Sequence, residues 1–366
     1  MVTGCYATRR PDEVGALQNV QHVVSNDDKP VLVRLLRSRN TDRFAGHPAP
    51  AAPETFEQST AERFGSGDGG CGASIASGTA GRTAFTLRVQ TGCSAPCAYC
   101  IIPATRGRPR SLRLMEALRE VDRARSAGFK EIVLTGVHLG SYGRDLTPPT
   151  SLTALLRALA ARVDHDVRFR MSSLEPMDCS NGVVDLIGQN ACFAPHFHLP
   201  LQHASDRILE SMRRPYTLDR YRSLVDRIRA RMPSTSIGAD VIVGFPGETD
   251  EDFKCLASYL PQSPITHVHV FPYSDRPGTE ASGMAGKSTG PVVRARAKAV
   301  RSISETLASR FRRSQIGTVH RALTLEGGSI AVTGNYLRMS LSSSLQRNEW
   351  VRLRIASEQD GVLLRG

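Results

Sequence analysis

The sequence predicts an α/β fold in three parts: a short α/β segment, an open partial barrel of six strand–helix units, and a small all-β barrel. Between Ala84 and about residue 314, six apolar, β-branched segments alternate with helical patterns. Such segments are typical of parallel strands that are buried on both faces and joined by right-handed helical crossovers. Six units do not close an eight-stranded barrel, so we expect an open barrel with its functional site at the carboxyl ends of the strands.

Each expected element follows from the spacing of apolar residues. The six barrel strands are expected at residues 85–90, 131–137, 167–173, 196–201, 237–245 and 267–273. In the helices between them, apolar residues share one face, as at Leu114, Leu118 and Val121. A long basic helix is expected over 291–314, and the strand-like segments after it, separated by Gly, Asn and Asp, predict the all-β barrel.

These patterns divide the chain into four regions. They are the α/β segment at 1–43, a linker at 44–82, the partial barrel at 83–314 and the all-β barrel at 315–366. The linker is rich in Gly, Ala, Ser and Pro, and this composition cannot bury much apolar surface. We therefore expect it to be flexible.

The composition is that of a globular protein with a strong positive charge. Of the 366 residues, 40% are hydrophobic and 22% are charged, and the formal net charge is +12. A basic surface attracts polyanions, so nucleic acid is the expected partner, although charge alone defines neither fold nor specificity. No apolar run is long enough to span a bilayer, and the first residues lack the pattern of a signal peptide. We therefore expect a cytoplasmic protein without a membrane partner.

Three of the eight cysteines form a C-x3-C-x2-C motif, at Cys93, Cys97 and Cys100, directly after the first expected barrel strand. Disulfides are improbable in a large intracellular chain, and clustered cysteines indicate metal or redox chemistry. Three thiolates in one loop can ligate three irons of a 4Fe–4S cluster and leave the fourth iron open to S-adenosylmethionine (SAM). Zinc is the alternative, but it normally needs a fourth ligand, often from a second C-x2-C, which the sequence lacks.

The segments around this motif resemble the radical SAM superfamily and, within it, the methylthiotransferase family. The similar segments are 91–111, 172–176, 196–206, 212–217, 240–249 and 270–279. The resemblance implies a partial, TIM-like (β/α)6 barrel, SAM and a 4Fe–4S cluster as cofactors, and an electron donor such as flavodoxin or ferredoxin. It also implies that residues 315–366 are a small RNA-binding barrel of the TRAM type.

One loop, TGVHLGSYGRDL at residues 135–146, resembles the family branch that modifies N6-threonylcarbamoyladenosine at position 37 of tRNA. The implied reaction adds a methylthio group to C2 of that adenine, and the implied partner is the anticodon loop of tRNA. Gln202–His203 has a form seen in the branch that acts on a ribosomal-protein aspartate, so this function stays an alternative. A third alternative is a remnant that binds RNA through its basic barrel, with SAM cleavage only or with no catalysis.

The resemblance assigns the SAM-cleaving cluster to the three cysteines of the motif. The residues expected near SAM are Tyr99, Thr135, Gly136, Glu175, Gln202 and Gly244. Turn geometry is the alternative role for the glycines, and a helix cap or salt bridge is the alternative for Glu175. The arginines expected to contact RNA are Arg106, Arg108 and Arg110 near the cysteines, and Arg321 and Arg338 in the all-β barrel. No catalytic side chain is singled out.

Six histidines are candidate metal ligands by residue type alone. They are His138, His196, His198, His203, His267 and His269. The pairs at 196/198 and 267/269 have strand spacing, so the members of each pair are expected to share a face. Since the cysteine motif already supplies a metal site, we favour packing or polar-network roles for all six.

One departure from the family concerns a second, auxiliary cluster, to which the family's amino-terminal domain supplies three cysteines for sulfur transfer. Residues 2–14 resemble the segment that carries the third of these cysteines, so Cys5 is its counterpart. The two earlier cysteines have no counterpart, and Cys71 in the linker is not expected to replace them. We therefore expect a truncated chain of poor solubility, with a doubtful auxiliary cluster, that cleaves SAM but transfers sulfur poorly.

Overall fold

The computed structural model describes residues 1–26, 28, 32 and 83–366, except residues 165, 342, 343, 360, 361 and 366. The linker expected at 44–82, with Cys71, lies outside the described residues. Among the described residues, no helix is both long enough and apolar enough to cross a membrane.

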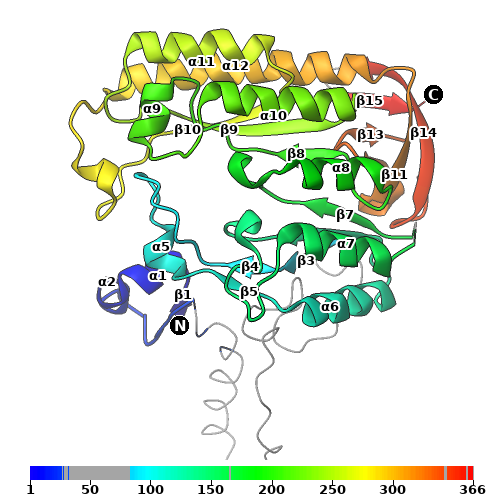
Figure 1. Cartoon of the computed structure of the whole chain (residues 1–366), viewed down its shortest axis with the longest axis horizontal. Helices are drawn as coiled ribbons and strands as arrows, with labels where there is room; N and C mark the ends of the chain where they lie inside the picture. The colour runs from blue at the N-terminus through cyan, green and yellow to red at the C-terminus, as the bar shows by residue number, and fades with distance from the viewer. Residues whose placement is uncertain are drawn as a thin grey trace, which may run out of the picture.

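The centre of the molecule is a partial barrel of parallel strands, which confirms the predicted fold class. Its strands are β3 (Ala84–Arg88), β6 (Glu131–Thr135), β7 (Arg168–Met171), β8 (His196–His198), β9 (Ser236–Val243) and β10 (His267–Pro272). The first three pair in chain order in one sheet, and the last three do so in another. An isolated bridge between Ser173 and His198 joins the two sheets. The carboxyl ends of all these strands therefore meet at one end of the barrel (Figure 1).

Amphipathic helices cover the outside of the partial barrel. They are α6 (Leu114–Ser126), α7 (Leu152–Arg162), α8 (Asn181–Gln189), α9 (Asp206–Ser211), α10 (Leu218–Arg231), α11 (Asp250–Gln262) and α12 (Gly290–Ser314). Ser151, Ser180, Thr217 and Thr249 begin four of them, because each side-chain oxygen accepts a hydrogen bond from an amide in the first turn. The long basic helix predicted at 291–314 is α12, which lies alongside α11 (Figure 1).

The carboxyl-terminal segment forms a closed barrel with its own apolar core. Its strands are β11 (Val319–Leu325), β12 (Ile330–Thr333), β13 (Arg338–Ser340), β14 (Trp350–Gln359) and β15 (Val362–Arg365), in the order β11-β12-β13-β15-β14. The sequence predicts one strand over residues 330–341, but this segment divides into β12 and β13 at a turn where Tyr336 has φ 67°. Ala322, Met339 and Ile355 are fully buried between the strands.

A buried ion-pair cluster attaches this barrel to the amino-terminal ends of the strands of the partial barrel. Glu131, the first residue of β6, pairs with Arg168 and Arg170 of β7, at 2.6 Å and 3.1 Å respectively from the two Nε atoms. Both guanidinium groups also donate to the closed barrel, Arg168 to the Val332 carbonyl oxygen at 3.2 Å and Arg170 to the Gly334 carbonyl oxygen at 2.9 Å. The closed barrel therefore lies at the end of the sheet opposite to the strands' carboxyl ends.

The amino-terminal segment is small and lies beside the carboxyl ends of the strands. β1 (Val2–Thr3) pairs in parallel with β2 (Val23–Val24), and α1 (Cys5–Arg9) and α2 (Pro11–Gly15) lie between them in sequence. The sequence predicts a strand from Val20 to Val24, and the strand found there, β2, begins at Val23. α1 packs against α5 (Ile102–Arg106), which follows the cysteine loop (Figure 1).

Candidate iron–sulfur and SAM site

The cysteine loop leaves the partial barrel at β4 (Gln90–Thr91) and returns at β5 (Arg110–Ser111), which pairs antiparallel with β4. Gly92 (φ +74°) turns the chain into the loop, and a Cβ atom there would lie 2.0 Å from the Arg108 carbonyl oxygen. The Cys93 amide donates to the Gly107 carbonyl oxygen at 3.1 Å and closes the loop. The loop conformation thus depends on a glycine directly before the first cysteine of the motif.

Replacing Gly92 with alanine is expected to lower iron uptake during anaerobic reconstitution by about tenfold or more, because the new Cβ atom must displace the Arg108 backbone and with it the loop. The matched control is Gly128→Ala, since Gly128 also has a positive φ (+83°) but has open space around the Cβ position and lies outside the cysteine loop, after α6. The control should lose only about 1 kcal/mol of stability and retain its iron. Equal iron content in the two variants, measured by iron analysis, would contradict this account.

The three thiols of the motif are free, partly buried and close enough to interact electrostatically. Burial raises the pKa of Cys97 and of Cys100, and the neighbouring thiols of the motif add to the rise. Burial also opposes ionisation of Cys93, but hydrogen bonds from His138 and from the Ala95 amide lower its pKa overall. The Ala95 amide lies 3.3 Å from the Cys93 sulfur, and His138 Nδ1 lies 3.6 Å from it.

His138, Asp178 and Arg144 form a chain of charged groups that ends at the Cys93 sulfur. His138 Nε2 lies 2.7 Å from Asp178 Oδ2, and Arg144 donates to Asp178 Oδ1 at 2.6 Å. The hydrogen bonds to Asp178 and to Cys93 raise the pKa of His138 to about 9. At neutral pH the imidazole is therefore protonated, and it presents a positive charge to the Cys93 sulfur.

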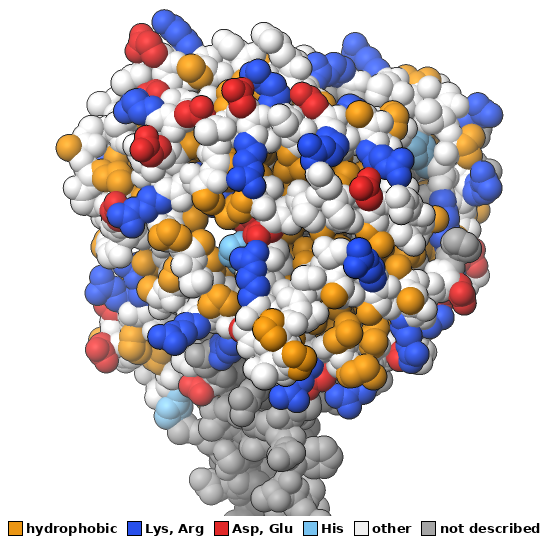
Figure 2. All heavy atoms as spheres, viewed as in Figure 1, with side chains coloured by type: hydrophobic (Ala, Val, Ile, Leu, Met, Phe, Trp, Pro, Cys, Tyr) orange, Lys and Arg blue, Asp and Glu red, His pale blue; other side chains and the backbone are white. Residues whose placement is uncertain are grey.

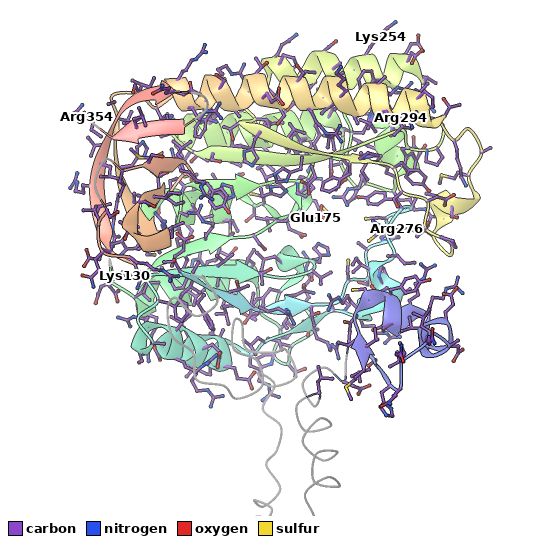
Figure 3. The ribbon with its side chains drawn as sticks, turned by 180° about the vertical axis from the view of Figure 1, so that it is seen from behind. Lys130, Glu175, Lys254, Arg276, Arg294 and Arg354 are labelled. Atoms are coloured by element: carbon purple, nitrogen blue, oxygen red, sulfur yellow. The ribbon has the colours of Figure 1, made fainter. Side chains whose placement is uncertain are left out.

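Arg214 plays the equivalent part at Cys97. Its Nη1 atom lies 3.2 Å from the Cys97 sulfur, and its Nη2 atom pairs with Glu175. The Arg214 side chain is only 2% exposed, and it stacks on the ring of Tyr216 at 5.1 Å. Figure 3 shows Glu175 in the middle of the molecule, between the two sheets.

The donor set fits a 4Fe–4S cluster with one open iron. Three thiols lie in one loop beside two cationic side chains, which favour the thiolate form that ligates iron. None of the other described cysteines lies in this loop, because Cys179 and Cys192 are buried elsewhere in the core, Cys255 is exposed on α11, and Cys5 is on α1. Three protein ligands leave a fourth iron for the amino and carboxylate groups of SAM.

Comparisons with known proteins agree with this geometry. Residues 87–260 match the radical SAM superfamily. The threonylcarbamoyladenosine tRNA methylthiotransferase MtaB of Aquifex aeolicus is 34% identical over 355 residues, which cover 97% of this chain and 82% of the relative. MtaB of Thermotoga maritima is 33% identical, over 88% of this chain and 70% of the relative. The chain belongs to the radical SAM methylthiotransferase family.

Two further similarities set the limits of this assignment. The ribosomal protein methylthiotransferase RimO of Saccharopolyspora erythraea is 38% identical, but only over 68% of this chain and 51% of the relative. The solved structure of the radical SAM methyltransferase TsrM from Kitasatospora setae, with tryptophan and a SAM analogue bound, has a TM-score of 0.52. At 15% identity, over 73% of this chain and 54% of TsrM, this likeness shows the fold.

The strand-end residues expected near SAM lie at the same end of the partial barrel as the cysteine loop. Thr135 is the last residue of β6, and Gly136 comes directly after it. Gly136 packs against Gln90, because a Cβ atom at Gly136 would lie 3.1 Å from the glutamine side chain. Gln202 has a positive φ of 65°, and its backbone is fixed by hydrogen bonds with the Asp240 carbonyl oxygen and the Ile242 amide. These residues lie beyond the carboxyl ends of the strands, and their contact with SAM stays a prediction.

Two other residues expected near SAM have mainly apolar neighbours. Tyr99 is packed in a small cluster with Met212 and Phe245, and burial raises the pKa of its phenol. Gly244 has φ +76°, and a Cβ atom there would lie 2.5 Å from Val293 of α12. Its glycine therefore permits close packing of the β9 turn against α12, which is the structural alternative for this residue.

The arginines expected to contact RNA fall into two groups at opposite ends of the partial barrel. Arg106 ends α5, Arg108 follows it in the cysteine loop and Arg110 begins β5, and the last two are exposed. Arg321 and Arg338 lie on the closed barrel, where Arg321 covers the ring of Trp350 at 3.8 Å. Figure 2 shows lysine and arginine side chains spread over one face among acidic and apolar ones, rather than gathered in a single patch.

Sequence reasoning did not single out Arg214 or Asp178, and it placed His138 in a polar network without linking it to a cysteine. The signal for Arg214 was its position inside the family segment 212–217. No pattern links Asp178 to Cys93, because the two residues meet only through the imidazole of His138.

Proposed function

We propose that this chain is a radical SAM tRNA methylthiotransferase that adds a methylthio group to C2 of N6-threonylcarbamoyladenosine at position 37 of tRNA. The observation that carries the proposal is the three-thiol loop at the carboxyl end of the partial barrel, with a cation at Cys93 and another at Cys97. The similarity to MtaB relatives over nearly the whole chain supports this substrate. SAM and a 4Fe–4S cluster are the proposed cofactors.

When bound, the reduced cluster supplies the electron that cleaves SAM to methionine and a 5′-deoxyadenosyl radical. Cys93, Cys97 and Cys100 would hold three of its irons. The proton on His138 and the guanidinium of Arg214 would stabilise the sulfur charge of Cys93 and Cys97 and fix the orientation of their side chains.

The other chain groups at the strand ends would orient SAM. Glu175, fixed by Arg214, would accept hydrogen bonds from an amino group. The backbone of Gly136 and Gln202 would lie close to SAM, and the ring of Tyr99 would lie against the adenine of SAM. The apolar packing around Tyr99 would exclude water from the radical.

The proposed macromolecular partner is the anticodon loop of tRNA. Arg106, Arg108 and Arg110 lie beside the cysteine loop, where phosphates of an inserted nucleotide would pass. Arg321 and Arg338 on the closed barrel would contact the RNA backbone further away. Flavodoxin or ferredoxin is the proposed electron donor.

Cys5 is the proposed ligand for an auxiliary cluster. Asn26 donates to the Cys5 sulfur at 3.6 Å and to the Thr105 carbonyl oxygen at 3.2 Å, so Cys5 lies next to the helix that follows the cysteine loop. One thiolate does not hold a cluster by itself, so the stoichiometry of iron decides whether this site forms.

We expect the anaerobically reconstituted chain, given SAM, a reductant and tRNA that carries N6-threonylcarbamoyladenosine, to bind about four irons and to form 5′-deoxyadenosine. Nucleoside mass spectrometry would report the 2-methylthio product, and about eight irons per chain would show a second cluster able to transfer sulfur. The matched reaction contains ribosomal protein in place of tRNA, because Gln202–His203 and the RimO relative favour that function as the second candidate. If the ribosomal protein were methylthiolated and the tRNA were left unmodified, the proposed tRNA substrate would be wrong and the ribosomal protein would take its place.

A further inference from the structure

Histidines from two strands and an aspartate from a third gather inside the partial barrel, away from the cysteine loop. His198 lies on β8, Asp240 on β9 and His269 on β10, the three strands of one sheet. Asp240 and His269 are direct partners in the register of β9 and β10. His198 and His269 line a cavity of about 860 Å³ between the partial barrel and the closed barrel.

The three side chains converge on a single point. His198 Nε2 lies 2.9 Å from Asp240 Oδ1, and His269 Nδ1 lies 3.3 Å from the same oxygen. One ligand atom from each residue lies within 4.8 Å of the other two. Two imidazole nitrogens and one carboxylate oxygen at this spacing are the ligand set of three-residue zinc sites and of the facial triad that binds Fe²⁺.

The oxygen at the centre of this group lacks a hydrogen-bond donor. Asp240 Oδ1 is buried and has no hydrogen-bond partner within the described structure, and the two imidazole nitrogens lie near it only at ion-pair distance. A buried carboxylate oxygen without a partner is costly, and a cation would satisfy it. Arg168 and Arg170, which line the same cavity, pair with Glu131.

A glycine on β9, Gly238, leaves room for the histidine side chains of this group. Gly238 lies two residues before Asp240 and faces the same side of the sheet. A Cβ atom at Gly238 would lie 2.5 Å from His267 Nε2 and 2.9 Å from His198 Nδ1. Because Gly238 has no side chain, the imidazole of His198 can lie close enough to the strand to contact Asp240.

We propose that His198, Asp240 and His269 form a binding site for a divalent first-row transition-metal ion of the zinc class, separate from the cysteine loop. The site joins the three strands of one sheet through side chains. His269 is 59% exposed and lines the cavity, so an ion and water can reach the site from solvent. The earlier preference for a polar-network role is thereby revised for His198 and His269, and it is kept for the other four histidines.

Zn²⁺ is the probe for the first test, with the cluster already in place so that the three cysteines of the motif are occupied. Isothermal titration and metal analysis after dialysis should show one zinc per chain beyond the cluster iron. Asp240→Asn and His269→Gln should each weaken zinc binding by about tenfold or more. The matched control is His320→Gln, because His320 lies on the closed barrel and bonds Thr318 instead. Equal binding by all four proteins would overturn the proposal.

The second test needs no variant at the proposed site, so it stands even if those variants fold poorly. X-ray absorption of the zinc-loaded, cluster-containing chain should show only nitrogen and oxygen ligands at about 2.0–2.1 Å, with outer-shell scattering from imidazole. Sulfur at about 2.3 Å would place the zinc on a cysteine and overturn the assignment. No zinc retained at micromolar concentration would overturn it as well.

Discussion

The Cys97→Ala variant is expected to lose its cluster and to reduce 5′-deoxyadenosine formation from SAM to background. Cys97 is the middle ligand of the three, and with two thiols left in the loop a 4Fe–4S cluster has too few protein ligands to persist. The change also leaves the buried guanidinium of Arg214 facing an empty position beside Glu175. Iron analysis, visible absorption and chromatography of the SAM products measure the effect.

Cys255→Ala is the control for Cys97→Ala, because Cys255 is an exposed cysteine on α11 outside the loop. It should retain about four irons per chain and full SAM cleavage. Circular dichroism separates loss of the cluster from loss of the fold. Normal SAM cleavage by a folded Cys97→Ala chain would remove the cysteine motif from the proposed mechanism.

The sequence predicted the elements whose signals are local. The barrel strands are runs of apolar, β-branched residues, and the cysteine motif lies within eight residues, so both are readable without knowledge of the fold. Residues 330–341 were harder, because the turn that divides them depends on the positive φ of Tyr336, and a tyrosine gives no signal for it.

The partners of the cysteines could not be read from the sequence, because they come from loops that are distant along the chain. Arg214 reaches Cys97 across 117 positions, and His138 reaches Cys93 across 45. The inward direction of His198, Asp240 and His269 was partly predictable from strand alternation, but their convergence depends on the register of β9 against its neighbours. Register is set by the packing of the whole barrel.

The least predictable feature is Glu131, which begins an apolar strand and is nevertheless buried with two arginines at the junction of the two barrels. We expect Glu131→Gln to lower the free energy of unfolding by about 3–5 kcal/mol, because removing one partner leaves two buried guanidinium groups without their counter-ion. The carbonyl contacts of Arg168 and Arg170 to the closed barrel should weaken with it.

Trp350, the only tryptophan of the chain, makes its fluorescence a direct measure of this junction. Its ring lies under the guanidinium of Arg168 at 4.9 Å, and its Nε1 donates to the Asp166 carbonyl oxygen at 2.9 Å. Urea unfolding followed by this signal should show a lower midpoint for Glu131→Gln. The control Glu251→Gln removes an exposed helix pair with Lys254 and should change stability by about 0.5 kcal/mol or less.

The effect of Glu131→Gln should depend on pH in a defined direction. Burial alone would raise the pKa of Glu131, but the charges of Arg168 and Arg170 lower it overall. A carboxyl group with a lowered pKa in the folded state contributes stability that is complete above its unfolded pKa of about 4.3 and is lost as the pH falls through the lower folded value. The stability difference between wild type and Glu131→Gln should therefore be constant from neutral pH to about pH 5 and shrink below about pH 4. A difference that grew on acidification would mean that Glu131 is protonated in the folded protein and that the arginines are held by the carbonyl groups of the closed barrel alone.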